Sequence, residues 1–251
     1  MRRPGTESRL TIRRVQALVV HDVVVSERER APALDAATSS AVDSEWARAL
    51  ASRPHLVDDW LFSVERVELP AIVGVFVPYR WFVAQCAKPG LHTILRVAPL
   101  AVTGRVVTTD RHLVFGLRSV RNVQDPGCWE LAPSGGVDPS ARTAAGIVDP
   151  EVTVRRELEE ELGVQDAEVI DAVCVGLAVH PESPVHDLVY DVAITLTAEQ
   201  LRARSTTRRH AEHDAFEYPE VDAAPGPLEP SLLAAATRAI LALPFATMDG
   251  A

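Results

Sequence analysis

A group of glutamates between Arg156 and Val164 has a spacing that could hold a cation. Glu157, Glu160 and Glu161 lie three and four residues apart, so an α-helix would turn their carboxylates toward one face. Like charges at this spacing repel one another, and turning them toward the interior is unfavourable unless a positive charge neutralises them. A ligand set made only of oxygen suits Mg²⁺ or Mn²⁺. The pattern therefore indicates a magnesium or manganese site, although an acidic run taken alone is more often a solvated helix face.

The neighbouring residues fit a helix that packs on a core and then ends. Val154, Leu158 and Leu162 recur every four residues and form an apolar stripe beside the acidic face. Arg156 can brace a carboxylate with two hydrogen bonds. Gly163 follows the last turn, where a positive φ ends a helix at little cost. One face of the predicted helix would pack, and the other would bind.

The order Arg-Glu-apolar-x-Glu-Glu-x-Gly-apolar, which begins at Arg156, resembles the signature helix of the Nudix hydrolases. The lead-in Trp-Glu-Leu-Ala-Pro-Ser-Gly-Gly, which ends at Gly136, is similar to the strand and glycine loop that precede this helix in the family. The family spacing would place the glycine at Arg142, six residues after Gly136, and it would place a glutamate where Val148 stands. We interpret the difference as an insertion of six residues in the loop before the helix.

The missing carboxylate at Val148 has two candidate replacements, Asp149 and Glu151. Asp149 is followed by Pro150, and aspartate at the N-cap with proline at the first helical position is a common helix start. For Asp149 we therefore favour the structural role.

The resemblance implies a role for each matching residue. Glu160 and Glu161 would be the principal metal ligands, and Glu157 would be a ligand or the base that activates water. Arg156 would fix these carboxylates in place. The physical requirement agrees, since a cation can bridge phosphoryl oxygens and offset the charge that develops on them.

The resemblance also implies residues outside the helix. Gly136 would let the backbone approach the site closely, and Arg118, which ends a strand as Arg-Ser, would contact the substrate. Many family members add a carboxylate from a later loop, and the candidates here are Glu182, Asp187, Glu212 and Glu217. We favour Glu212 as the catalytic residue because it precedes a late strand. The adjacent His210 and His213 lack the spacing of a zinc motif and are expected to be surface histidines.

An arginine among aromatic residues is a further candidate for substrate binding. In Tyr79-Arg80-Trp81-Phe82, Arg80 could stack on a nucleobase or hold a phosphate. The same stretch could instead begin an aromatic-rich helix packed between two subdomains. The spacing does not decide between the two.

Length and composition bound the class of protein. The chain has 251 residues, 47% of them hydrophobic and 24% charged, as in globular proteins. A net charge of −10 argues against a nucleic-acid partner. Three widely spaced cysteines argue against disulfides and zinc. Neither a signal sequence nor a membrane-length apolar run is present, so the expected location is the cytoplasm, with no membrane partner.

The expected fold is α+β: a Nudix domain at residues 95–251, with a mixed β-sheet between helices in an α/β/α sandwich, preceded by a smaller N-terminal α+β region at residues 1–94. In the N-terminal region, the pattern predicts strands within 10–25, a helix at 35–52 and strands at 61–67 and 72–77. In the larger region it predicts a hairpin of 100–107 and 112–118, long strands at 167–178 and 185–196, and a last helix at 231–243.

The resemblance implies a hydrolase that cleaves the diphosphate linkage of a nucleoside diphosphate derivative. The layout is similar to Nudix enzymes that act on nucleotide sugars such as UDP-glucose and UDP-galactose, with a nucleoside monophosphate and a sugar 1-phosphate as products. The alternatives are a hydrolase of ADP-ribose, a dinucleotide or another diphosphate, and a non-catalytic module that senses a nucleotide. Sensors tend to lose the helix glutamates, and all three are present here. A homodimer is implied by the resemblance alone.

Overall fold

The computed structural model describes residues 24–27, 31, 33–68, 71–144, 147–179, 184–205, 212–226, 228–243 and 245. The strands predicted within residues 10–25 lie outside this part of the chain, apart from the first residues of β1. In chain order the strands are β1 (Val24–Glu27), β2 (Trp60–Glu68), β3 (Ala71–Pro78), β4 (Leu100–Val107), β5 (Phe115–Arg118), β6 (Trp129–Leu131), β7 (Ser134–Gly136), β8 (Ile147–Val148), β9 (Val169–Val179), β10 (His186–Ile194) and β11 (His213–Glu217). The α-helices are α1 (Ala36–Ser52), α2 (Tyr79–Ala87), α3 (Pro89–Leu95), α4 (Pro150–Glu157), α5 (Ala198–Ser205) and α6 (Ala235–Leu241).

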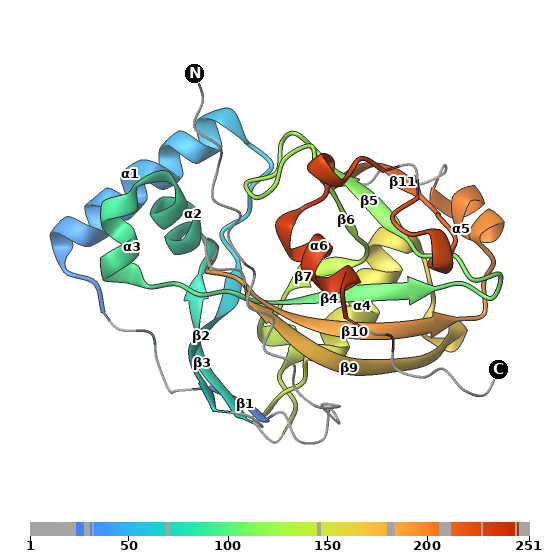
Figure 1. The fold of residues 1–251 in the computed structure, drawn as a ribbon. Helices are drawn as coiled ribbons and strands as arrows, with labels where there is room; N and C mark the ends of the chain where they lie inside the picture. The colour runs from blue at the N-terminus through green and yellow to red at the C-terminus, as the bar shows by residue number, and fades with distance from the viewer. Residues whose placement is uncertain are drawn as a thin grey trace.

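A mixed sheet in the order β7-β4-β10-β9 forms the centre of the molecule (Figure 1). β10 runs parallel to β4 and antiparallel to β9, and β7 pairs antiparallel with β4. Successive residues of a strand face opposite sides of a sheet. Tyr190 of β10 accordingly packs in one core with Val154 and Leu158, while its neighbour Val189 packs in another core with Ile240 of α6. The sheet thus lies between α4 and α6, which confirms the predicted α+β sandwich.

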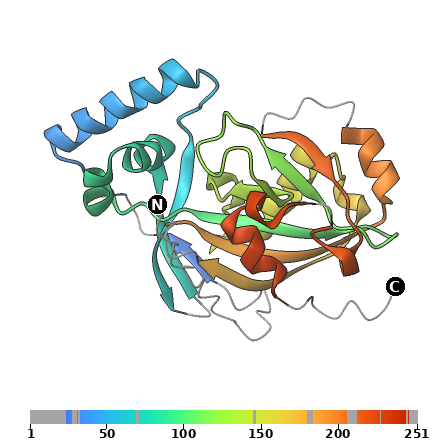
Figure 2. The same ribbon diagram turned by 45° about the horizontal axis from the view of Figure 1, so that its top comes forward.

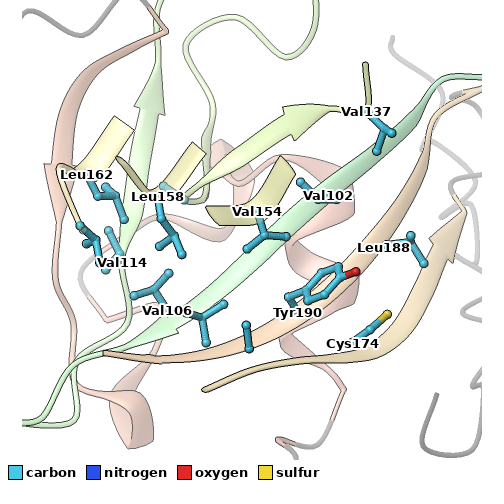
Figure 3. Packing of buried hydrophobic residues seen from close by; sticks show 14 of the residues in the cluster. Val102, Val106, Val114, Val137, Val154, Leu158, Leu162, Cys174, Leu188 and Tyr190 are labelled. Atoms are coloured by element: carbon cyan, nitrogen blue, oxygen red, sulfur yellow. The ribbon is translucent and has the colours of Figure 1, made fainter. Parts of the chain in front are cut away.

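The apolar stripe of the acidic helix is confirmed. Val154 and Leu158 are completely buried, and Leu162 is nearly so. Figure 3 shows the three side chains pointing from the helix toward Val106 of β4 and Tyr190 of β10. This packing holds the acidic helix against the central sheet.

The predicted hairpin of residues 100–107 and 112–118 is wrong beyond its first pair. Only the bridge between Val107 and Leu113 joins the two segments. β4 is paired along its length with β10, whereas β5 turns away into a second sheet, ordered β11-β5-β6. The two strands diverge because each has a partner that is distant in sequence.

The N-terminal region contributes a third sheet, in the order β2-β3-β1-β8. β8 belongs to the loop before α4, so the additional residues of that loop reach the N-terminal sheet. Phe62, Ile72 and Phe76 share the core that contains Val154. Helices α1, α2 and α3 gather at one end of the molecule (Figures 1 and 2). Within the described residues, no helix has the length and apolar content needed to cross a membrane.

Candidate active site

The acidic helix changes its geometry halfway along. α4 ends at Glu157, and Leu158–Leu162 form a π-helical turn that ends at Gly163, where φ is 71°. A π-turn is wider than an α-turn. Glu161 points inward and is 6% exposed, whereas the side chain of Glu160 is 63% exposed. The predicted shared face therefore brings Glu157 and Glu161 inward and leaves Glu160 on the solvent side.

The carboxylate of Glu157 lies against the backbone of Gly135. A Cβ at Gly135 would come within 2.3 Å of Glu157 Oε1, whereas a Cβ at Gly136 would meet nothing within 4 Å. The close approach expected at Gly136 is thus found one residue earlier. Because any side chain at residue 135 would displace Glu157, this glycine preserves the position of the carboxylate.

Arg156 braces the glutamates from the solvent side, as the resemblance implies for it. Its Nη2 donates to Glu157 Oε1 at 2.8 Å, and its Nε lies 3.9 Å from Glu160 Oε1. Its Nη1 donates to Ser140 Oγ at 2.7 Å and also to Asp138. Asp138 and Ser140 lie in the loop between β7 and α4, so this loop fixes the brace.

A buried chain of polar groups lies behind Glu161. Arg118 Nη1 donates to Glu130 Oε1 at 2.5 Å, and Ser134 Oγ donates to the same oxygen at 3.0 Å. His213 Nε2 lies 2.9 Å from Glu130 Oε1, and His213 Nδ1 lies 3.6 Å from Glu161 Oε2. Neither carboxylate oxygen of Glu161 meets the geometry of a hydrogen bond, and the backbone N–H of Ser134 only weakly opposes the effect of burial on its pKa. The imidazole therefore stands between two buried carboxylates, of which only Glu130 is satisfied.

The surroundings of the three buried glutamates shift their pKa values in opposite directions. Burial raises the pKa of Glu161 well above its usual range, and the charges of Glu212 and Glu157 add to the effect. Burial likewise raises the pKa of Glu157 to about 7, although Arg156 opposes the shift. Burial also disfavours the charged form of Glu130, yet its bonds with His213 and Arg118 lower its pKa below the usual value. Positive charge therefore balances Glu130 but not Glu161, and Arg156 only partly offsets the burial of Glu157.

A cavity of about 690 Å³ opens in front of Glu157. Five of the predicted site residues line it: Arg118, Gly136, Arg156, Glu157 and Glu212, the last of these exposed. Asp187, another carboxylate candidate, also lines it, and burial raises the pKa of Asp187 to about 7. Asp59, Trp60 and Tyr79 of the N-terminal region complete the wall. The cavity thus joins the acidic helix to the N-terminal region.

Several candidates lie elsewhere. Arg80 is not part of the cavity lining, because its guanidinium is 3.3 Å from Asp58 and 3.5 Å from Asp43. Glu217 is exposed at the end of β11 and does not line the cavity. Glu182 lies outside the described residues.

The loop residues before the helix have structural positions. Val148 is buried and belongs to β8. The Asp149 side chain accepts a hydrogen bond from the backbone N–H of Glu151 at 3.1 Å, which is N-cap geometry. Glu151 itself pairs with Arg155 at 2.7 Å, on the same helix. The structural role favoured for Asp149 agrees with these contacts.

Sequence reasoning missed the roles of Glu130 and His213. The expectation of a surface histidine at residue 213 is wrong, because His213 is 2% exposed. The ring lies across Gly116 of β5, where an added Cβ would come within 2.3 Å of His213 Cδ2. For Glu130 a signal was available, since a glutamate between Trp129 and Leu131 in a short apolar strand is unusual.

The residues present fit a divalent cation in their chemistry. Buried carboxylate oxygens without donors, next to a second carboxylate with a raised pKa, are the hard oxygen ligands that Mg²⁺ and Mn²⁺ prefer. Within the described part of the chain, no three His, Cys, Asp or Glu side chains are already gathered as a complete ligand set. Magnesium sites commonly complete their coordination with water and substrate phosphate. A site of this kind does not require three protein ligands.

Comparison with known proteins identifies the family. The model of the NUDIX domain matches residues 98–241, more than half of the chain. Similar solved structures include a MutT protein from Methanosarcina mazei Go1, with TM-score 0.38 and 20% identity over 57% of this chain and 89% of that one. Another is DR0079 from Deinococcus radiodurans, with TM-score 0.35 and 18% identity over 49% of this chain and 68% of that one. The comparison with curated proteins found no match. On the strength of the domain match, which includes the whole acidic helix, the chain belongs to the Nudix family and is a Nudix-type diphosphate hydrolase.

Proposed function

We propose that the protein hydrolyses the diphosphate linkage of a nucleotide sugar, giving a nucleoside monophosphate and a sugar 1-phosphate. The observation that carries the proposal is the cavity, whose lining includes Glu157 and Arg156 of the acidic helix as well as the aromatic side chains of Trp60 and Tyr79. A volume of about 690 Å³ lies within the range of small-molecule sites and can hold more than a diphosphate. Further groups of the substrate therefore have a place in it.

A divalent cation, Mg²⁺ or Mn²⁺, would be held by Glu157 and Glu161, with Glu160 on the solvent side. When bound, it would offset the charge of the diphosphate and lower the pKa of water. Arg156 keeps Glu157 in place through its contacts with Asp138 and Ser140. These residues are our assignment of the metal site.

The remaining residues have roles that follow from their position at the cavity. Hydrolysis forms a bond between a water oxygen and one phosphorus, and it breaks the bond from that phosphorus to the bridging oxygen, which leaves with the second phosphate. Glu212 is exposed at the cavity and is our candidate for the base that accepts the proton of this water. Arg118 lies at the wall, where it can contact a phosphate oxygen.

The N-terminal wall supports a substrate with a sugar and a base. Trp60 is 50% exposed and Tyr79 lines the same wall, so both can stack against a flat base or the face of a sugar ring. Asp59 and Asp187 can accept hydrogen bonds from sugar hydroxyls. In this proposal the N-terminal region, residues 1–94, selects the substrate and the Nudix region, residues 95–251, carries the chemistry. A homodimer stays a prediction that sedimentation can test.

The test is product analysis by chromatography. UDP-glucose, UDP-galactose, ADP-ribose and a dinucleotide are incubated with Mg²⁺ and either the wild-type protein or Glu161→Gln. We expect UMP and sugar 1-phosphate from the UDP-sugars with the wild type, and neither product with the variant. Cleavage of ADP-ribose or the dinucleotide in preference to UDP-sugars would reject the substrate class but keep the metal site. Equal turnover by the variant would reject the assignment of Glu161.

A further inference from the structure

His213 is a buried imidazole whose position depends on several independent features. It is 2% exposed, and its ring lies over Gly116, the residue of β5 that leaves room for it. Phe216 of the same strand lies against the ring, with centroids 5.3 Å apart. The backbone of His213 pairs with Arg118 across β11 and β5. The ring is therefore held by two strands and does not depend on Glu161 for its place.

The two ring nitrogens face different carboxylates. Nε2 lies 2.9 Å from Glu130 Oε1, within hydrogen-bond distance. Nδ1 lies 3.6 Å from Glu161 Oε2, and both Nδ1 and the Glu161 oxygens have no hydrogen-bond partner. A movement of about 0.8 Å by the carboxylate would bring this pair to an ordinary hydrogen-bond length. An unpartnered ring nitrogen thus faces a buried carboxylate oxygen.

We propose that His213 is a positioning residue that orients the carboxylate of Glu161 as a metal ligand. Glu130 and Arg118 anchor the far side of the ring, so that a line of contacts runs from the cavity wall to the metal site. Residues that hold a ligand by hydrogen bonding commonly change metal affinity by about 10- to 100-fold when replaced. The proposal rests on the metal site of the proposed function, and not on the identity of the substrate.

Two substitutions of His213 test the contacts of its two ring nitrogens one at a time. The amide of asparagine falls near the position of Nδ1, and that of glutamine near Nε2. His213→Asn therefore keeps a donor toward Glu161 and gives up Glu130, whereas His213→Gln keeps a donor toward Glu130 and gives up Glu161. Asp214→Asn changes the exposed neighbour on β11 and serves as the control.

The measurement is Mn²⁺ binding to the protein alone, by titration calorimetry, together with the Mg²⁺ dependence of kcat and the melting temperature without metal. We expect His213→Gln to weaken Mn²⁺ binding by about 10-fold or more and to recover kcat at saturating Mg²⁺. His213→Asn and Asp214→Asn should bind Mn²⁺ within about 3-fold of the wild type, a difference below 1 kcal/mol.

Unchanged Mn²⁺ binding in His213→Gln, with a lower melting temperature in both histidine variants, would mean that His213 only supports the fold and would overturn the proposal. Equal weakening in both variants would overturn it as well. Absence of sugar-nucleotide cleavage by the wild type would reject the proposed substrate, while the Mn²⁺ titrations still decide the role of His213. If both variants unfold, the ¹⁵N spectrum of the wild-type imidazole decides: Mg²⁺ should shift Nδ1, and an unmoved Nδ1 signal contradicts the proposal.

Discussion

Glu161 is a residue whose burial opposes folding of the metal-free protein. Its carboxylate is buried without a hydrogen bond, and burial raises its pKa well above the usual range. We expect Glu161→Gln to lower kcat by at least about 100-fold, because the amide is a poorer cation ligand of the same size. The melting temperature of the metal-free variant should equal or exceed that of the wild type, and Mg²⁺ should no longer raise it. Thermal melts with and without Mg²⁺ check this, and a marked loss of stability in the metal-free variant would contradict it.

Adjacent glycines in β7 give a matched test of the space around Glu157. Gly135→Ala would place a Cβ 2.3 Å from Glu157 Oε1, whereas the same change at Gly136 meets nothing within 4 Å. We expect Gly135→Ala to reduce kcat by about 10-fold or more, since small misplacements of a catalytic group are costly. Gly136→Ala should remain within about 3-fold of the wild type, below 1 kcal/mol. Steady-state kinetics of both variants test this difference. Equal activity would contradict the idea that Gly135 preserves the position of Glu157.

Asp187 makes stability depend on pH. Burial raises its pKa from 3.8 to about 7, with the charge of Glu130 adding to the effect. Between these values the folded chain holds a proton that the unfolded chain has released, so the free energy of unfolding falls as pH rises from about 4 to about 7. Asp187→Asn has no carboxyl group to titrate, so its free energy of unfolding should not fall in this way between about pH 4 and about pH 7. Its advantage over the wild type should grow from near zero at pH 4 to about 2–4 kcal/mol at pH 8. Urea unfolding of both proteins at several pH values measures this difference. The prediction is contradicted if the free energies of unfolding of the two proteins change with pH in parallel.

At the scale of elements, the N-cap of α4 can be separated from the metal site. Asp149 accepts a bond from the Glu151 backbone and does not line the cavity. We expect Asp149→Ala to lower the free energy of unfolding by about 1 kcal/mol, the usual cost of losing a cap. Mn²⁺ affinity should stay unchanged. Urea unfolding tests the expected loss of stability, and Mn²⁺ titration tests the unchanged affinity. A large loss of Mn²⁺ binding would indicate that Asp149 is a metal ligand instead.

The sequence predicted the acidic helix, its apolar stripe and its end at Gly163, because these depend on local spacing. It did not predict the π-turn, since the 3.6-residue period assumes α-helical geometry throughout. The turn keeps Leu158 and Leu162 buried and also directs Glu161 inward. Whether this segment forms a π-turn or an α-turn depends on tertiary packing, which the spacing of residues along the chain does not describe.

The position of His213 shows the same limit in a strand. The residues around His213 lack the spacing of a zinc motif, so a surface histidine was expected there. The histidine is buried because Gly116, almost a hundred residues earlier, leaves space for its ring. Sequence patterns detect neighbours along the chain, whereas this contact depends on the pairing of β11 with β5.

At the scale of the whole molecule, the N-terminal and Nudix regions share a core and a cavity. Phe62, Ile72 and Phe76 pack with Val154 and other residues of the Nudix region. We expect a fragment of residues 95–251 to melt at a much lower temperature than the full chain, or without a cooperative transition, because it exposes this apolar surface. Circular dichroism melts and binding of a hydrophobic dye test the expectation. A cooperative melt equal to that of the full chain would instead favour two independent domains.

The central sandwich was predictable, because long apolar strands and the signature helix indicate it. The loop before α4 was predicted only as an insertion. Its β8 strand has two residues, too few for any periodicity, and it exists because β1 offers an open edge. In the stretch from Tyr79 to Phe82 the sequence singled out Arg80, whereas Tyr79 lines the cavity. The contribution of Trp60 was not predicted, because regions distant in sequence meet at this wall.

The pairing of β8 with β1 has a consequence for synthesis on the ribosome. β2 and β3 can form a hairpin as soon as they emerge, and β1 can then join β3 in parallel. The far edge of β1 stays uncovered until residues 147–148 leave the exit tunnel, more than a hundred residues later. The uncovered edge can pair with another nascent chain during that interval. Pausing translation after β3 has emerged from the tunnel and before residues 147–148 emerge should therefore increase aggregation, whereas a pause after they have emerged should not.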